Sequence, residues 1–271
     1  MAVDQAGKDG AITIEDGKGM ETSLDILEGF RFDSGYVANA FITDERRGAV
    51  KYDNCFMLVT DYKIDAVEDI MPTLEIIARD GRPLVIVAEE VEGQALAALI
   101  MNQTRGTLRV AAIKAPRYGE ERRGILKDLC ISVGATFISR ESGRKLSEIS
   151  LEDLGTCRSI ESIKNFTTIV GGNADLEEIE QAIEDLKTEL GQTDNLRECE
   201  RIQERITRLA SGVAIIRVGA ATEVEMIEKK HRIEDALEAI KSAQEEGVVP
   251  GGGVALVKAI ADLEVEVDNE D

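Results

Sequence analysis

The chain has 271 residues, of which 43% are hydrophobic and 31% are charged. This length suits about two domains, and the apolar content supports a buried core, which excludes a wholly disordered chain. The 32 Lys and Arg residues against 53 Asp and Glu residues give a net charge of −21. Such a surface repels phosphate backbones and anionic lipids, so we expect no nucleic acid and no membrane among the partners. We also expect no membrane span and no signal peptide, because no apolar run approaches the roughly 20 residues that a span needs.

The four cysteines are spread singly, without a CxxC pair, at Cys55, Cys130, Cys157 and Cys199. We expect buried free thiols, which are typical of a reducing compartment, and hence a cytoplasmic protein. His231 is the only histidine and lies in a charged helical stretch. We therefore set aside a histidine-built zinc site and a Ser-His-Asp triad, and we predict no metal site.

The first two thirds of the chain alternate between strand-like and helix-like segments. A short alternating strand at 11–15 and a turn at 16–19 come first. Apolar strand-like runs then lie at 55–59, 84–88, 108–113 and 135–139, and helical stretches lie between them at 66–79, 94–105 and 120–133. Strands of this type separated by helices of about 12 residues predict an α/β fold with a largely parallel sheet flanked by helices.

After residue 173 the pattern becomes mainly helical. Apolar residues at spacings of three and four predict a helical hairpin over 176–190 and 196–209. A strand at 213–218, a charged helix at 223–246, a Pro-Gly-Gly-Gly turn at 250–253 and a last amphipathic helix follow. The three glycines before that helix would let the backbone approach a phosphate closely, or they form a flexible turn.

Charged residues at the predicted strand ends raise the possibility of an enzyme. Ligands of a parallel α/β sheet bind beyond the carboxyl ends of its strands, where this chain has Asp61, Glu89, Glu90 and Lys114. The carboxylates would serve as acid and base and Lys114 would hold an anion. Solvated loop residues explain the same pattern, and no glycine-rich phosphate loop follows the first strand.

Two predicted helices are more apolar than one buried face requires. Residues 95–101 are seven consecutive apolar residues, almost two helical turns, so their side chains point in every direction. The helix at 66–79 also spreads its apolar residues beyond one stripe. Leaving six such side chains in water would forgo on the order of 10 kcal/mol of burial free energy. Either another element of the chain covers this surface, or a partner does.

Several motifs together resemble the group I chaperonins, the GroEL type. They are EGFRFDSGY at 28–36, AEEVEG at 88–93, VAAIKAP at 110–116, VGAATEVEM at 218–226, EDAL at 234–237 and EEGVVPGGGVA at 245–255. The resemblance covers essentially the whole chain. It implies a fragment of the family protein, because the family's main phosphate loop, Gly-Asp-Gly-Thr-Thr, is absent from the sequence.

The resemblance implies a division into segments of three domains. Residues 28–213 would form the apical domain, and residues 1–27 and 214–245 would form a small, discontinuous α+β intermediate domain. Residues 246–271 would start the equatorial domain. Gly29 and Gly212 would be hinges at the two crossings between the apical and intermediate segments.

The resemblance also implies a chaperone that binds non-native polypeptides and a small ring co-chaperonin through an apolar apical groove. The residues that would line this surface are Tyr36, Ala38, Ala40, Phe41, Met71, Leu74, Leu96, Ile100 and Met101. Ala40 departs from the aromatic residue that is usual in the family. The family's double ring of sevenfold symmetry is expected of a full-length parent, whereas we expect a monomer or weak oligomer for this chain.

In the family, ATP and Mg²⁺ drive the folding cycle. Asp235 falls on the carboxylate that activates water for hydrolysis, and Gly251 and Gly252 fall on glycines that contact the nucleotide. We expect no nucleotide bound to this chain alone and no ATP hydrolysis by it. The alternative hypothesis is a free-standing α/β enzyme that uses Asp61, Glu89 and Lys114.

Overall fold

The computed structural model describes residues 12–261 except 18, 194 and 211, and the described chain divides into two compact units. Among the described residues, the first unit holds Leu24–Ile216 together with Ile12 and Thr13. The second unit holds Ile14–Ser23 and the described residues from Arg217 to Ala261. Two of the unit boundaries, at 23/24 and 216/217, differ from those at 27/28 and 213/214 that the resemblance implies, and a third at 13/14 divides the expected segment 1–27. No boundary separates residues 246–261, and the three-domain division stays a prediction. Residues 1–11 and 262–271 of the expected terminal segments lie outside the described part.

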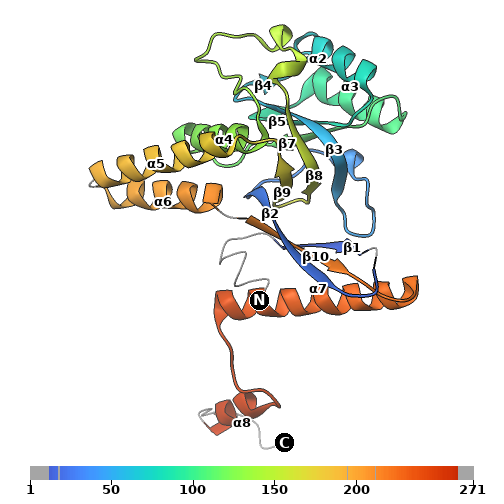
Figure 1. The fold of residues 1–271 in the computed structure, drawn as a ribbon, viewed down its shortest axis with the longest axis vertical. Coiled ribbons are helices and arrows are strands. Elements are labelled where there is room, and N and C mark those ends of the chain that lie inside the picture. Colours follow the sequence, from blue (N-terminus) through green and yellow to red (C-terminus); the bar gives the residue numbers. More distant parts are fainter. Residues whose placement is uncertain (1–11, 18, 194, 211, 262–271) are drawn as a thin grey trace, which may run out of the picture. The chain divides into compact units, whose positions relative to one another are not determined.

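Eight strands of the described chain form one mixed sheet, in the order β1-β10-β2-β9-β8-β3-β5-β7 (Figure 1). Their bounds are β1 Ile12–Asp16, β2 Ser23–Phe32, β3 Val50–Val59, β5 Leu84–Ala88, β7 Val110–Lys114, β8 Gly155–Ser162, β9 Thr167–Gly172 and β10 Gly212–Val218. The short strands β4 (Lys63–Ile64) and β6 (Glu90–Val91) pair separately.

The α/β class expected from the sequence is confirmed, but the sheet is not largely parallel. β5 pairs in parallel with β3 and with β7, because a helix crosses over between each pair. β8 pairs antiparallel with β3, and β9 pairs antiparallel with both β8 and β2. A short turn joins β8 to β9, which permits only the antiparallel arrangement. The strand expected at 135–139 is reduced to a single bridge between Thr60 and Ile138.

The helices follow the expected periodicity closely. They are α2 Val67–Asp80, α3 Gly93–Thr104, α4 Gly119–Val133, α5 Leu176–Gln192, α6 Leu196–Ala210, α7 Glu223–Glu246 and α8 Val254–Ala261, with a short 3-10 helix η1 at Asn39–Phe41. α3 packs on β7, η1 and α2, whereas α4 packs on β3, β8 and β9. The hairpin of α5 and α6 packs on α4. No described helix combines the length and the apolar composition that crossing a bilayer requires.

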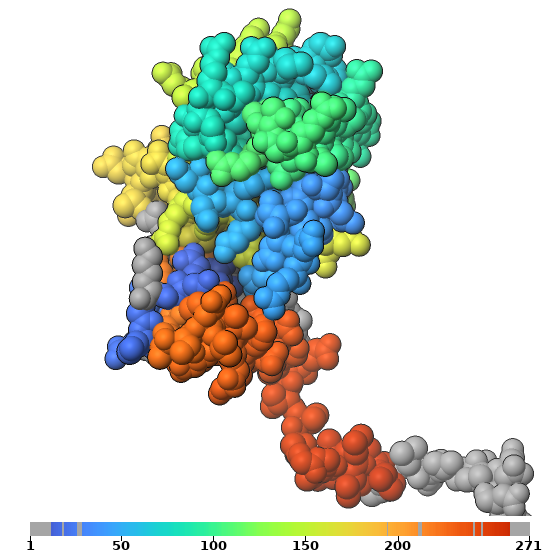
Figure 2. Space-filling model, turned by 90° about the vertical axis from the view of Figure 1, so that its right-hand side faces the viewer, coloured from blue at the N-terminus to red at the C-terminus, as the bar shows by residue number. Residues whose placement is uncertain are grey.

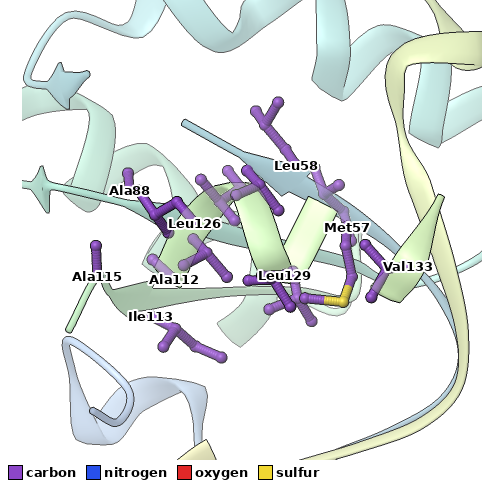
Figure 3. Packing of buried hydrophobic residues seen from close by; sticks show 14 of the residues in the cluster. Met57, Leu58, Ala88, Ala112, Ile113, Ala115, Leu126, Leu129 and Val133 are labelled. Atoms are coloured by element: carbon purple, nitrogen blue, oxygen red, sulfur yellow. The ribbon is translucent and has the colours of Figure 1, made fainter. Parts of the chain in front are cut away.

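The core of the first unit lies between the sheet and these helices. All five residues of β5 are buried, as expected for a central strand covered on both faces. In Figure 3, Met57 of β3 points toward Leu129 and Val133 of α4, and its neighbour Leu58 points to the opposite side. Three of the cysteines, Cys55, Cys130 and Cys157, are buried free thiols, whereas Cys199 is half-buried.

The second unit is built around the long helix α7. Thr222 caps the helix by accepting a hydrogen bond from the backbone N–H of Glu225. Lys230 of α7 forms an ion pair of 2.7 Å with Asp16 at the end of β1. The backbone N–H of Gly17 donates to the carbonyl of Val218 at 2.9 Å, which joins the ends of β1 and β10.

Candidate binding face

The helix α3 is attached to the sheet along one stripe of residues. Ala95 and Leu99 are fully buried, and Gln103 continues the stripe one turn further. The side-chain oxygen of Gln103 accepts hydrogen bonds from the Tyr52 hydroxyl and from the backbone N–H of Val110, both at 3.0 Å. Burial raises the pKa of Tyr52 to about 12, so this hydroxyl remains a donor at neutral pH. These contacts fix which side of α3 faces away from the sheet.

The remaining side of α3 presents apolar residues to solvent. Leu96 and Ile100 lie one turn apart and are half-buried against the core. Ala97 and Met101, also one turn apart, are exposed, and half of the Met101 surface (50%) is accessible. No residue of α3 carries an ionisable side chain. The outer side of this helix is therefore an uncharged apolar strip.

The neighbouring helix α2 also exposes one methionine. α2 packs against α3, and the two helices lie side by side in Figures 1 and 2. Ile70 and Ile77 anchor α2 in the core, whereas Met71 has 45% of its surface exposed. We define the apolar face as Met71, Leu96, Ile100 and Met101.

Two residues expected on a partly exposed groove belong instead to the core. Phe41 has an exposed fraction of 0% because η1 packs against α3 and β7. Leu74 is 5% exposed because it lies on the side of α2 that also carries the buried Ile70 and Ile77. The resemblance placed both residues on the binding surface, whereas the packing of η1 and α2 turns their side chains into the core.

The segment that leads into η1 covers the edge of β7. Tyr36 forms an isolated antiparallel bridge with Ile113, and the N–H of Val37 donates to the carbonyl of Ala112 at 2.9 Å. The side chains of Tyr36 and Ala38 are half-buried, and Ala40 is exposed. Of the nine expected surface residues, Tyr36, Ala38 and Ala40 thus lie on a segment pinned to the sheet edge that carries α3.

The strand-end carboxylates of the enzyme hypothesis, Asp61 and Glu89, both bind arginine residues. Glu89 forms ion pairs with Arg122 at 2.6 Å and with Arg140 at 2.7 Å. The hydrogen bond from Arg122 lowers the pKa of Glu89, so it stays ionised. Asp61 is buried and accepts the backbone N–H of Arg140 at 2.8 Å. These contacts give both carboxylates a structural role in holding the 138–144 loop, and Lys114 is exposed.

The residues that the resemblance linked to the nucleotide lie in the second unit. Asp235 is exposed on α7. Gly251 and Gly252 are exposed in the turn before α8, and added Cβ atoms there would meet nothing within 4 Å. Within the described residues no cluster of three or more His, Cys, Asp or Glu side chains could hold a metal ion. These residues alone do not fit a complete site for ATP and Mg²⁺.

The two expected hinge glycines lie inside the first unit. Gly29 is in the interior of β2, where it pairs with Val170, and Gly212 begins β10. A Cβ atom at Gly29 would lie 2.1 Å from Cγ2 of Val213 and 2.7 Å from the carbonyl oxygen of Ile169. Close strand packing therefore requires a glycine at this position, and its hinge role stays a prediction.

Sequence reasoning missed the groups that orient the apolar face and those that neutralise the strand ends. Gln103 follows Leu99 at the same four-residue spacing that joins Leu99 to Ala95, and this spacing could have identified it as the anchor of α3. Arg122 and Arg140 lie far from Glu89 in sequence, and no local pattern indicates the pairing.

The comparison with protein families agrees with this architecture. A model described as the TCP-1/cpn60 chaperonin family matches residues 3–270. The match covers both compact units and every element that carries the apolar face. The chain belongs to the TCP-1/cpn60 chaperonin family, whose members act in protein folding.

Proposed function

We propose that this chaperonin chain binds non-native polypeptides through the apolar face of α2 and α3. The observation that carries the proposal is that α3 has no ionisable side chain yet leaves Leu96, Ile100 and Met101 partly accessible. A folded partner keeps its apolar side chains inside, whereas a non-native chain exposes them, so an uncharged apolar strip distinguishes the two.

The chemistry of the strip favours broad selectivity. Apolar contact has no preferred direction, and the unbranched Met71 and Met101 side chains adapt to different shapes. An extended or helical segment of many sequences can therefore be accommodated. A single face of this size binds weakly, and an oligomer that presents several copies binds more tightly through multivalency.

The family match supports ring assemblies in general, and we propose the finer features from the sequence motifs. The motifs at 28–36, 218–226 and 245–255 support the group I type. The longer parent would then form a sevenfold double ring in the cytoplasm, capped by a small co-chaperonin that shares the apolar face, with ATP and Mg²⁺ driving the cycle. Asp235, Gly251 and Gly252 would supply part of its nucleotide site.

A charge placed on the strip tests the proposal. Met101→Glu puts a carboxylate where a client's apolar side chain must lie, at a position exposed enough to leave the fold intact. The affinity for a reduced, carboxymethylated protein that cannot refold is measured by fluorescence anisotropy, and the melting temperature by circular dichroism. We expect at least a tenfold loss of affinity with a melting temperature within a few degrees of the parent.

Leu176→Glu is the matched control. Leu176 is also a half-exposed apolar helix residue of the first unit, on α5 rather than on the apolar face. We expect its affinity for the unfolded protein to equal that of the parent. Equal affinities for the Met101→Glu chain and the parent would exclude this face as the client site.

A further inference from the structure

Cys55 and Cys157 face each other across two antiparallel strands. They are directly paired in the register of β3 and β8. Their sulfur atoms lie 3.1 Å apart, and both side chains are buried. Directly opposed residues of an antiparallel pair have Cα atoms about 4.5–5.5 Å apart, inside the range of about 4.4–6.8 Å that a disulfide spans. A bond of about 2.0 Å thus requires only a small rotation of the two side chains.

We propose that Cys55 and Cys157 are a site of reversible oxidation that forms a cross-strand disulfide with a low-molecular-weight disulfide as the oxidant. The other two cysteines lie in different surroundings. Cys130 is buried on α4. Cys199, on α6, is half-buried, and its thiol donates a hydrogen bond to the carbonyl of Thr193 at 3.2 Å. The chain therefore holds one pre-arranged pair and two separate thiols.

The reaction balances as two steps of thiol–disulfide exchange. One thiolate of the pair attacks a sulfur of the oxidant RSSR, which forms a protein–S–S–R mixed disulfide and releases RS⁻. The second thiolate then attacks the protein sulfur of that mixed disulfide, forms the Cys55–Cys157 bond and releases a second RS⁻. Two cysteine thiols lose two protons and two electrons, and one oxidant disulfide becomes two thiols.

The closed sheet protects the pair from this reaction. The hydrogen bond to Cys55 and the burial of the side chain both raise the pKa of the Cys157 thiol, so the reactive thiolate is scarce in the closed state. Oxidation therefore requires the strands to open locally.

Irregular backbone next to the pair provides a place for such opening. Asn54, just before Cys55, has a positive φ of 50°. Gly171, just before the Gly172 that pairs with Cys157 on β9, has a φ of 61°. The regular β conformation is thus interrupted next to Cys55 on β3 and next to the partner of Cys157 on β9. These interruptions favour opening of the sheet at the cysteine pair over opening at other positions of these strands.

The test is disulfide mapping after exposure of the folded, fully reduced 271-residue chain to glutathione disulfide. Samples are quenched by acid, alkylated and digested, and linked peptides are identified by mass spectrometry. We expect a Cys55–Cys157 peptide to accumulate while circular dichroism remains native, and Cys199 to carry only glutathione. Because the bond closes a loop between residues 102 positions apart, we expect the linked chain to melt roughly 5–10 °C higher, and dithiothreitol to reverse the shift.

Single substitutions separate the pair from the other cysteines. In a Cys157→Ala chain, Cys55 has no resolving thiol and should retain glutathione, whereas Cys130→Ala should link as the parent does. A linkage that appears only after circular dichroism is lost would overturn the proposal. A linked chain that melts no higher than the reduced chain would also overturn it, because the bond would then not fit the native sheet.

Discussion

The guanidinium group of Arg205 on α6 donates two hydrogen bonds to the carboxylate of Asp128 on α4, at 2.8 and 2.9 Å. Asp128 is 1% exposed, and the pair joins the helical hairpin to α4. The planar guanidinium satisfies both carboxylate oxygens, which is the geometry that makes a buried charge tolerable. The two residues therefore fix the position of α6 on α4.

Removal of the arginine should destabilise the fold strongly. Arg205→Ala leaves the Asp128 carboxylate buried without its counter-charge, and we expect the free energy of unfolding to fall by about 3–5 kcal/mol. Urea denaturation measures the change. Arg201→Ala on the same helix is the control: its pair with Glu198 is exposed at 3.3 Å, so a loss below about 1 kcal/mol is expected. Equal losses for both variants would contradict a special role for the buried pair.

Phe41 should affect stability and not client binding directly. Its ring is fully buried between η1, α3 and β7, so Phe41→Ala leaves a cavity and should cost about 3–5 kcal/mol. Met101→Ala removes a half-exposed side chain and should cost less than about 1 kcal/mol. Thermal unfolding and unfolded-protein binding are measured on both chains. A stable Phe41→Ala chain that has lost binding would place Phe41 back on the client surface.

Gly29 should resist substitution because of close packing. A methyl group there overlaps Cγ2 of Val213 and the carbonyl of Ile169, so Gly29→Ala should cost about 1–3 kcal/mol. Val213→Ala in the same chain should recover part of that loss. Gly191→Ala is the control, since an added Cβ atom at that position on α5 meets nothing within 4 Å. Chemical denaturation is measured on the parent, the Gly29→Ala chain, the Gly29→Ala/Val213→Ala chain and the Gly191→Ala chain. The comparison shows whether the overlap, rather than the loss of a glycine, lowers the stability.

The Arg144–Asp153 pair should contribute to acid sensitivity. Arg144 binds both oxygens of Asp153 at 2.7 and 2.8 Å, and Ser150 adds two hydrogen bonds. Arg144 above all, with help from Ser150, holds the pKa of Asp153 well below its ordinary value of about 3.9. The folded chain therefore binds fewer protons than the unfolded chain in acid.

The sign of the effect follows from that difference in proton binding. The stabilisation by Asp153 is complete above about pH 5 and is lost as the pH falls through the lowered pKa. Asp153→Asn should be less stable at pH 7 but should lose less stability between about pH 5 and pH 2 than the parent. Arg144→Gln removes the cause of the shift and should flatten the same part of the curve. Parallel pH curves for the parent and both variants would contradict the assignment.

The isolated chain should not hydrolyse ATP above background. Asp235 is exposed on α7, and no cluster of three or more His, Cys, Asp or Glu side chains among the described residues could hold the Mg²⁺ ion. Release of inorganic phosphate is measured with the 271-residue chain and with its Asp235→Ala variant, and both should match the buffer. In a full-length parent, Asp235→Ala should lower hydrolysis and leave nucleotide binding largely intact. Turnover by the short chain that does not depend on Asp235 would contradict this assignment.

The sequence predicted the helices well and the sheet only in part. Apolar spacing placed α5 and α6 within two residues of their observed bounds, because each helix repeats the same signal over several turns. β8 and β9 were missed, although they pair with each other across a short turn. Their other partners, β3 for β8 and β2 for β9, lie far away in the sequence, so no local pattern shows that the two strands belong to the sheet. The burial of Phe41 likewise depends on η1 meeting α3, which no local pattern encodes.

Because α3 has no ionisable side chains, the strength of contact with it and the rate at which a partner approaches the acidic chain depend on different properties of the partner. Contact with α3 itself involves no charge, so the strength of that contact should vary little with salt or with pH near neutrality. The net charge of −21 acts at longer range, where it speeds the approach of basic chains and slows that of acidic ones. In the proposed binding mode, the apolar side chains of a client would govern how long it stays bound, whereas its net charge would govern how often it arrives.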